Sequence, residues 1–369
     1  MNLLFDCHTF DAGPQGTTTF LAGLLNALPE AAQTLERPLS LTCAAKDPGS
    51  VARFINVPHQ YEQITGGFAS RNLVELPRLT RTRPVDVVVS QYVRPFRSRV
   101  ATVSVIHDVL FLDFTTLFGW RYRMLRQILF GWAARHSDVV ITVSSYSRDR
   151  IAHHFGIPPE RIDVLPNAVN VTAPLPPAVL PRAAGQPLRL LYVSRFETRK
   201  RQHWCVAAAQ ALASRGHQVE LTLVGHAEGA YADAVMVGIA AREISGAQVS
   251  IRSNVSQSDL EAMYGATDLF LFPSQCEGFG IPVIEAAAYG IPCVVAANTA
   301  MRELAGHYAG IGVEAGEADF VDAVMDAVDR LPQLRQEALA RAPGTRDAYR
   351  WSDVAREFAA ILDRRGVFA

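Results

Sequence analysis

The sequence lacks an uninterrupted apolar stretch of 18 or more residues, so it predicts no membrane-spanning helix. Its first residues, Met1–Asp6, run directly into an expected strand without a basic leader or a cleavage motif, so no secretory signal is expected. Cysteine is scarce, and its five copies are scattered, mostly inside apolar runs. This usage disfavours a disulfide framework or a zinc site and favours reduced thiols in the cytoplasm.

The composition is that of a folded protein with more than one domain. At 369 residues the chain exceeds what one hydrophobic core usually supports. Its continuous Val, Ile and Leu runs alternate with helical segments, a pattern typical of parallel sheets that are covered on both faces. The expected strands are 2–5, 39–42, 85–89, 102–106, 139–143, 162–165, 188–193, 219–224, 249–252, 269–272 and 293–296.

A proline-rich segment divides these strands into two series. It predicts an N-terminal Rossmann-like domain at 1–170, a linker at 171–187 and a C-terminal Rossmann-like domain at 188–350. The expected fold class is therefore α/β with two doubly wound domains. Open sheets of this kind bind ligands at the carboxyl ends of their strands, so a cleft between the two domains is expected to hold the substrates.

The most informative segment is 277–285, which reads Glu-Gly-Phe-Gly-Ile-Pro-Val-Ile-Glu after an expected buried strand. Gly278 and Gly280 let the backbone approach a ligand closely, and Pro282 suits the first turn of a helix. A helix start attracts phosphate through its N–H groups and dipole. Glu285, one turn further on, is placed to accept hydrogen bonds from ribose hydroxyls. Together these features suggest a nucleotide-sugar ligand.

Gly-x-Gly before a helix is also common in α/β proteins that bind no phosphate. A Rossmann dehydrogenase is disfavoured because Val283 stands where the third glycine of its fingerprint belongs, and because the loop comes late in the second domain. A sugar-nucleotide epimerase of the same fold and a non-catalytic nucleotide-binding module remain as alternatives.

Several motifs together resemble glycosyltransferase family 4, whose members are retaining enzymes of the GT-B fold. Glu277 and Glu285 match its Glu-x7-Glu spacing, and Arg195 and Lys200 match its Arg-x4-Lys at the end of a strand. His107, followed by Asp108, resembles its strand-end histidine. The segments 165–170 and 349–352 also match, so the resemblance spans nearly the whole chain.

The resemblance implies a role for each matched residue. Arg195 and Lys200 would stabilise the charge of the leaving nucleotide, while Glu277 and His107 would hold the hydroxyls of the donor sugar. Arg199 and Arg201 flank the two cations, and part of this run is expected to be solvated surface. The expected catalytic residues are His107, Arg195, Lys200 and Glu277, and the expected donor-binding residues are Gly16, Gly278, Phe279, Gly280, Ile281 and Glu285.

The resemblance further implies that the C-terminal helix, about 351–369, packs back on the first domain. The sequence contains no Asp-x-Asp metal element, so we expect a metal-independent enzyme that needs no cofactor besides its nucleotide-sugar donor. GDP-mannose is favoured because 197–200 and 299–303 are similar to segments of bacterial mannosyltransferases of O-antigen or exopolysaccharide synthesis. UDP-glucose and UDP-N-acetylglucosamine are the alternative donors, and the expected acceptor is a glycan or a lipid-linked glycan.

The stretch from Arg71 to Arg135 holds eleven arginines and four acidic residues in a chain of net charge −1. Within it, segment 118–136 interleaves aromatic residues with arginines and could lie on an anionic membrane surface, making the protein peripheral on the inner face of the membrane. The same pattern also fits an ordinary surface helix that buries its apolar side on a sheet. Nucleic acid is disfavoured because no binding motif accompanies the basic residues.

Overall fold

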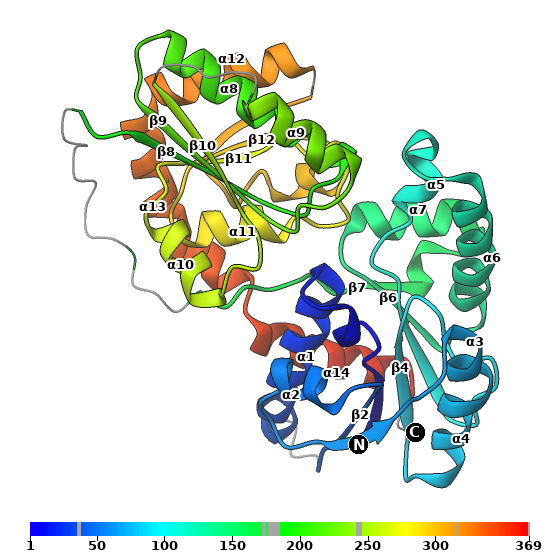
Figure 1. Ribbon diagram of the computed structural model, residues 1–369. Helices are drawn as coiled ribbons and strands as arrows, with labels where there is room; N and C mark the ends of the chain where they lie inside the picture. The colour runs from blue at the N-terminus through cyan, green and yellow to red at the C-terminus, as the bar shows by residue number, and fades with distance from the viewer. Residues whose placement is uncertain (35–37, 172–174, 176–184, 241–245, 315, 368–369) are drawn as a thin grey trace. The chain divides into compact units, whose positions relative to one another are not determined.

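The computed structural model describes residues 1–34, 38–171, 175, 185–240, 246–314 and 316–367. The chain divides into two compact units (Figure 1). The first unit contains Met1–Ala168 together with Tyr349–Ala369, and the second contains Val169–Ala348. Most of the expected linker, 171–187, lies outside the described residues.

The first unit is built on a seven-stranded sheet with the order β3-β2-β1-β4-β5-β6-β7. All neighbouring strands run parallel. The central strands are buried, as their runs of Val, Ile and Leu predict. The strands are β1 (Asn2–Asp6), β2 (Ser40–Ala45), β3 (Gln60–Gln63), β4 (Val87–Gln91), β5 (Ala101–Val105), β6 (Val139–Thr142) and β7 (Ile162–Val164).

Helices connect most of these parallel strands, whereas β4 and β5 are joined by a segment without a helix, 92–100. Ser144 accepts a hydrogen bond from the Ser147 amide at the start of α7, and Gly156 ends that helix in the left-handed conformation. The helical elements are η1 (Phe10–Ala12), α1 (Gly16–Thr34), α2 (Pro48–Phe54), α3 (Phe68–Ser70), the π-helical turn η2 (Arg71–Glu75), α4 (Leu76–Thr82), α5 (Leu110–Asp113), η3 (Thr115–Leu117), α6 (Trp120–His136), α7 (Ser145–Phe155) and η4 (Pro159–Arg161).

Helix α14 (Trp351–Arg364) belongs to the first unit although it follows the whole of the second unit in the chain. It packs on α1, where Trp351 lies edge-on to Phe20. Gly23 makes this contact close, because a Cβ atom at that position would lie 2.1 Å from the Trp351 ring. Arg365 just beyond the helix donates a 2.8 Å hydrogen bond to Asp163, which ties the segment to the end of the sheet.

The second unit repeats the pattern with a six-stranded parallel sheet in the order β10-β9-β8-β11-β12-β13. Its strands are β8 (Leu188–Val193), β9 (Val219–Val224), β10 (Ala247–Arg252), β11 (Leu269–Phe272), β12 (Cys293–Ala296) and β13 (Gly310–Val313). Its helical elements are η5 (Thr198–Lys200), α8 (Gln202–Ser214), α9 (Ala230–Ala240), α10 (Gln257–Gly265), α11 (Ile281–Ala288), η6 (Thr299–Leu304), α12 (Glu317–Asp329) and α13 (Leu331–Ala348).

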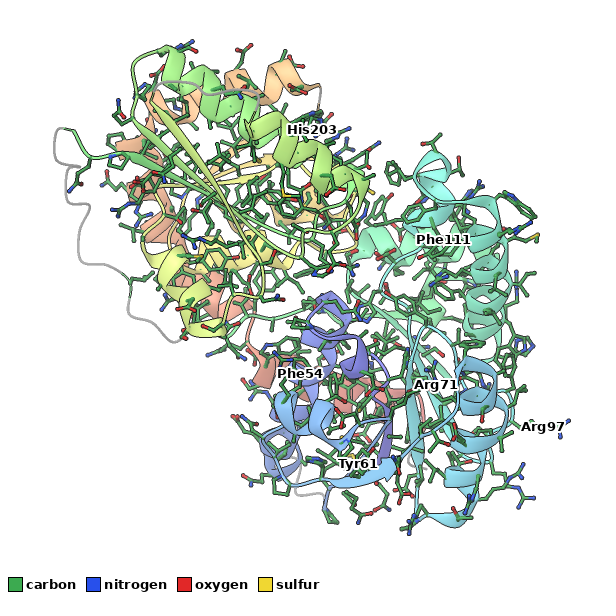
Figure 2. The ribbon with its side chains drawn as sticks, viewed as in Figure 1. Phe54, Tyr61, Arg71, Arg97, Phe111 and His203 are labelled. Carbon is green, nitrogen blue, oxygen red and sulfur yellow. The ribbon has the colours of Figure 1, made fainter. Side chains whose placement is uncertain are left out.

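Two of the four edge strands, β3 and β13, were not expected from the sequence. Strand β3 has the polar sequence Gln-Tyr-Glu-Gln, and its Tyr61 is labelled in Figure 2. Strand β13 reads Gly-Ile-Gly-Val and is only partly buried. An edge strand pairs on one side only, so it needs no continuous apolar run. The α/β fold class with two doubly wound sheets is confirmed.

Candidate active site

The glycine turn lies where the sequence places it, at the carboxyl end of β11 and the start of α11. Gly280 is the residue before α11 and has a φ of 110°, a conformation that side chains rarely adopt. A Cβ atom there would lie 2.5 Å from Met301 Sδ. Phe279 is buried beside the turn, and Ile281 begins the helix. The positive end of α11 therefore faces this turn and favours an anion.

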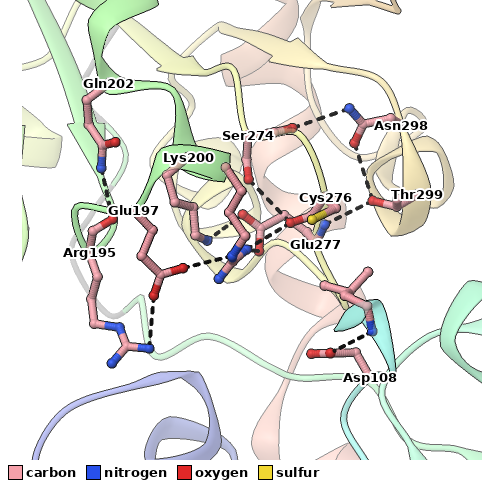
Figure 3. A network of polar contacts seen from close by, with 12 residues as sticks. Asp108, Arg195, Glu197, Lys200, Gln202, Ser274, Cys276, Glu277, Asn298 and Thr299 are labelled. Carbon is pink, nitrogen blue, oxygen red and sulfur yellow. Dashed lines mark hydrogen bonds and ion pairs between the residues drawn. The ribbon is translucent and has the colours of Figure 1, made fainter. Parts of the chain in front are cut away.

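Lys200 and Glu277, which are 77 positions apart in the chain, meet beside this turn (Figure 3). Lys200 Nζ donates to Glu277 Oε1 at 2.5 Å, and both side chains are nearly buried. Lys200 ends η5 directly after β8, and its carbonyl accepts a 3.1 Å hydrogen bond from the hydroxyl of the buried Tyr192. The pair is thus held by two adjacent strands of the sheet, β8 and β11.

Burial disfavours the charged forms of both Lys200 and Glu277. Burial lowers the pKa of Lys200, although the nearby Glu277 carboxylate partly offsets this. Burial also tends to raise the pKa of Glu277, but the charges of Lys200 and Arg199 outweigh it and hold that pKa below its usual value. Glu277 is therefore ionised near neutral pH and forms a buried ion pair with Lys200.

Arg195 and Arg199 extend the network through a shared carboxylate. Glu197 accepts from Arg195 at 3.2 Å and from Arg199 at 2.7 Å. Arg199 also donates a 2.9 Å hydrogen bond to the carbonyl of Cys276, next to the glycine turn. The side chain of Arg195 is 54% exposed, whereas that of Arg199 is 18% exposed. Arg199, expected only as a flanking residue, is thus part of the site.

Thr299 and Asn298 support the turn from the segment after β12, and they were not among the expected site residues. The Glu277 amide donates to Thr299 Oγ1 at 3.0 Å, while Asn298 Nδ2 donates to the Ser274 carbonyl at 3.3 Å. Thr299 has a φ of 46°, which is unusual for a β-branched residue. A strained backbone at this point is consistent with a functional site.

Glu285 lies on α11 and accepts a 2.8 Å hydrogen bond from the Tyr264 hydroxyl. Burial raises the pKa of Glu285 to about 7, even though the hydrogen bond from Tyr264 acts in the opposite direction. Tyr264 is itself buried and stacks on Tyr289, with ring centroids 5.2 Å apart. Tyr264 lies on α10, before β11, and no sequence motif pointed to it.

In the first unit, His107 follows β5 and is buried. Its Nε2 lies 2.6 Å from Gln91 Oε1, and because a carbonyl oxygen only accepts, Nε2 carries the proton. Burial lowers the pKa of His107 to about 3, so the ring is neutral and its Nδ1 is an acceptor. Gly16 is the first residue of α1, after the loop that follows β1 and η1. Both residues therefore lie where the sequence placed them, after strands β5 and β1.

No cluster of three or more His, Cys, Asp or Glu side chains in the described part of the chain is arranged to hold a metal ion. Within the same residues, no helix combines the length and the hydrophobicity of a membrane span.

Two family models match successive parts of the chain. The model of glycosyltransferase family 4 matches residues 35–173, and the model of glycosyl transferases group 1 matches residues 181–342. The first match falls in the first unit almost entirely, and the second falls in the second unit. The second match includes Arg195, Lys200, Glu277 and Glu285.

Two curated relatives transfer mannose. The O-antigen chain mannosyltransferase B of Escherichia coli is 25% identical over 230 residues, which are 59% of this chain and 58% of that protein. The GDP-mannose-dependent alpha-(1-6)-phosphatidylinositol monomannoside mannosyltransferase of Mycobacterium tuberculosis is 28% identical over 267 residues, or 66% of each chain. The matched regions thus span about three fifths to two thirds of these relatives.

Solved structures share the fold over the full length of the chain. Sucrose-phosphate synthase from Thermosynechococcus elongatus superposes with a TM-score of 0.80 at 16% identity, covering 100% of both chains. Anabaena HepE in complex with UDP-glucose gives a TM-score of 0.75 at 18% identity, covering 99% of this chain and 100% of that one. The two parallel-sheet units, together with the two family models that match successive parts of the chain, identify it as a member of glycosyltransferase family 4 with the GT-B fold.

Proposed function

We propose that the protein is a retaining hexosyltransferase that favours GDP-mannose as donor and a glycan or lipid-linked glycan as acceptor. The observation that carries the proposal is the buried Lys200–Glu277 pair beside the glycine turn, with Glu285 one helical turn further on. In this proposal Glu277 contacts the sugar of the donor, the glycine turn and Lys200 contact its diphosphate, and Glu285 contacts its ribose. The two mannosyltransferase relatives support the choice of sugar.

In this proposal the diphosphate lies at the start of α11, where Gly278 to Ile281 bring backbone N–H groups close to it. Arg195 and Lys200 supply the positive charge. Arg195 is half-exposed and shares Glu197 with Arg199, so it can turn toward a phosphate without leaving a buried charge behind. Lys200 is already held by Glu277, and that pairing fixes its position before the donor binds.

Cleavage of the glycosyl phosphate bond transfers negative charge to the leaving nucleotide. Fixed cations stabilise that charge more in the transition state than in the ground state, so Arg195 and Lys200 are proposed to lower the barrier. This arrangement would not need a metal ion. The phosphate of the donor would take the proton of the acceptor hydroxyl, and the new bond would keep the anomeric configuration of the donor.

Glu277 and His107 are proposed to hold the transferred sugar rather than to attack it. Glu277 is ionised by its cationic neighbours and can accept sugar hydroxyls through Oε2. His107 is neutral, and Gln91 fixes its proton on Nε2, which leaves Nδ1 to accept a hydroxyl proton. Gly16, at the start of α1, is proposed to leave room for the donor and the acceptor.

The donor is tested with a panel of nucleotide-sugars, by thermal shift and by hydrolysis without acceptor. GDP-mannose should raise the melting temperature most and should be hydrolysed slowly. A larger rise of the melting temperature with UDP-glucose, the ligand of the HepE structure, would show that UDP-glucose is the preferred donor. EDTA should leave the hydrolysis rate unchanged, and the first-formed free sugar should have the anomeric form of the donor.

A pair of variants separates nucleotide binding from general effects on the fold. Glu285→Ala should abolish the thermal shift by GDP, because the ribose loses its carboxylate. Asp329→Ala is the matched control, since the Asp329 side chain is 66% exposed on the same unit. If no nucleotide-sugar shifts the melting temperature of the wild-type protein, or if Glu285→Ala responds like the control, the proposed site is wrong.

A further inference from the structure

The solvent-facing side of α6 exposes more large apolar side chains than a surface helix usually does. Trp120 is 63% exposed, Leu125 is 57% exposed and Ile128 is 64% exposed. Met124 lies between them along the helix and is 53% exposed. Residues three and four positions apart share one face of a helix, so Met124, Leu125 and Ile128 form a continuous apolar strip.

The opposite side of the same helix is also apolar, and it is already buried. Phe130 and Ala134 belong to a core cluster that includes Phe155, while Phe118 and Leu129 pack against it. The helix therefore cannot rotate to bury Leu125 and Ile128 without exposing Phe130. A helix that is apolar on both sides indicates that its outer side is covered in the functional state.

A neighbouring segment of the first unit, which contacts α6 through Phe96, carries two further exposed apolar side chains. The Phe96 ring packs on Trp132 of α6 with centroids 4.6 Å apart, and the Phe96 amide donates to the Asn72 carbonyl of η2. Next to Asn72, Leu73 and Val74 are 53% and 60% exposed. We call this surface the α6 face, and it consists of Leu73, Val74, Arg97, Trp120, Arg121, Met124, Leu125, Ile128 and Arg135.

The charge of the α6 face is of one sign. Helix α6 contains four arginines and no Asp or Glu. Arg121 lies over the Trp120 ring at 5.3 Å, so this cation accompanies the most exposed aromatic ring. Figure 2 shows Arg97 projecting away from the body of the first unit. The nearby Asp113 is already paired with Arg150 and His154, so it does not neutralise the face.

We propose that the α6 face docks on an anionic lipid bilayer. Exposed aromatic and aliphatic side chains would enter the boundary between headgroups and acyl chains, and the arginines would contact lipid phosphates. The complementarity of charge favours this occupant over a second copy of the chain, because two copies would bring the arginines of both faces together. The proposal concerns where the protein binds and does not depend on which sugar it transfers.

Binding to vesicles tests the proposal directly. The full-length protein is mixed with vesicles of phosphatidylcholine that contain or lack about one third phosphatidylglycerol, and bound protein is separated by flotation. We expect binding to the anionic vesicles only, weakening as salt is added. The emission of Trp120 should also shift to shorter wavelength, because Trp204 and Trp351 are buried and Trp132 is half-buried.

Two double variants measure separately how apolar insertion and positive charge contribute to vesicle affinity. Leu125→Ser with Ile128→Ser should lower vesicle affinity about tenfold or more, through lost apolar insertion. Arg121→Gln with Arg135→Gln should lower it about thirtyfold, through lost attraction to lipid phosphates. Met236→Ser with Val237→Ser, which removes two exposed apolar side chains from α9 of the other unit, is the matched control and should bind like the wild type.

The proposal is overturned if anionic vesicles do not bind the wild-type protein at low salt, or if both α6 variants bind as well as the control. It is also overturned if sedimentation velocity shows a dimer that the Leu125→Ser, Ile128→Ser variant dissociates, since that result assigns the face to a second copy. The thermal shift by GDP in the same variants should equal that of the wild type, which keeps this test independent of the donor site.

Discussion

The hydroxyl of Tyr264 donates a 2.8 Å hydrogen bond to Glu285, the carboxylate proposed to hold the ribose of the donor. Burial raises the pKa of this carboxyl to about 7, so Glu285 changes charge within the physiological pH range. The contact therefore links the stability of the second unit and its affinity for a nucleotide to pH.

The first prediction concerns stability. The unfolded chain releases the Glu285 proton near pH 4.5, whereas the folded protein keeps it until about pH 7. The unfolded state therefore binds fewer protons between these values, and the contribution of this carboxyl to stability falls as pH rises through that window. Its total loss is on the order of 3 kcal/mol.

Glu285→Gln removes this titration. Relative to the wild type, the variant should gain unfolding free energy of about that size between pH 4.5 and pH 8, measured by urea denaturation at both values. An equal difference between the two proteins at both pH values would contradict the raised pKa.

The second prediction concerns donor binding. Ribose hydroxyls donate to the ionised carboxylate, so the affinity for GDP should fall below pH 7, approaching about tenfold per pH unit. Tyr264→Phe removes a hydrogen bond that lowers the pKa of Glu285, and the fall should then begin at higher pH. Calorimetric titration at several pH values measures this. Tyr289→Phe is the control, because Tyr289 stacks on Tyr264; a matching profile in both variants would refute the role of the Tyr264 hydroxyl.

The third prediction separates stability from turnover at the buried ion pair. Lys200→Met leaves the Glu277 carboxylate buried without its closest cation, which should cost about 3–5 kcal/mol of unfolding free energy. Adding Glu277→Gln should restore most of that stability. Turnover, however, should stay about a hundredfold or more below the wild type in the double variant, because the charge facing the leaving group is still missing.

The control for the ion pair is the exposed pair of Arg330 and Asp326 on the same unit, whose nitrogen and oxygen lie 3.0 Å apart. Arg330→Met should change the unfolding free energy by less than about 1 kcal/mol. Recovery of turnover together with stability in the Lys200→Met, Glu277→Gln protein would show that the pair has only a structural role.

The fourth prediction concerns the glycine turn. Gly280→Ala places a Cβ atom against Met301 in a left-handed backbone conformation, so the turn must shift and nucleotide affinity should fall at least about tenfold. Gly238→Ala on α9 meets no atom within 4 Å and should leave affinity unchanged while gaining up to about 1 kcal/mol of stability. Calorimetric titration with GDP compares the two variants, and equal affinities would argue against a phosphate at this turn.

The sequence predicts the buried strands well because a strand in the middle of a covered sheet must be apolar throughout. Strands β3 and β13, two of the four edge strands, do not follow this rule, because each has polar and partly exposed or glycine positions in place of an apolar run. The expected strand 85–89 corresponds to β4 at Val87–Gln91, a shift that extends the strand into two buried polar residues, Ser90 and Gln91. The buried polar side chain of Gln91 is satisfied by its contact with His107.

The residues of the candidate site also form two groups, those that the sequence predicts and those that only the structure places there. Lys200, Glu277 and Glu285 stand in motifs with fixed spacing, so the sequence names them. Tyr264 and Thr299 reach the site through tertiary contacts, and although Thr299 begins the segment 299–303 that resembles mannosyltransferases, only the structure places either residue in the site. For α6 the alternation of aromatic and basic residues indicated an amphipathic helix, but only the structure distinguishes Phe130, which is buried, from Ile128, which is not.

The first unit cannot complete its fold until α14, at the end of the chain, has been synthesised. During synthesis, Phe20 and Gly23 of α1 emerge from the ribosome long before Trp351, because all of Val169–Ala348 is translated in between. Until then the apolar side of α1 that contacts Trp351 is uncovered in the nascent first unit, and chaperones can bind it. A chain that ended before residue 349 would contain the whole second unit but a first unit without α14, so a single cut between the two units cannot yield two complete halves.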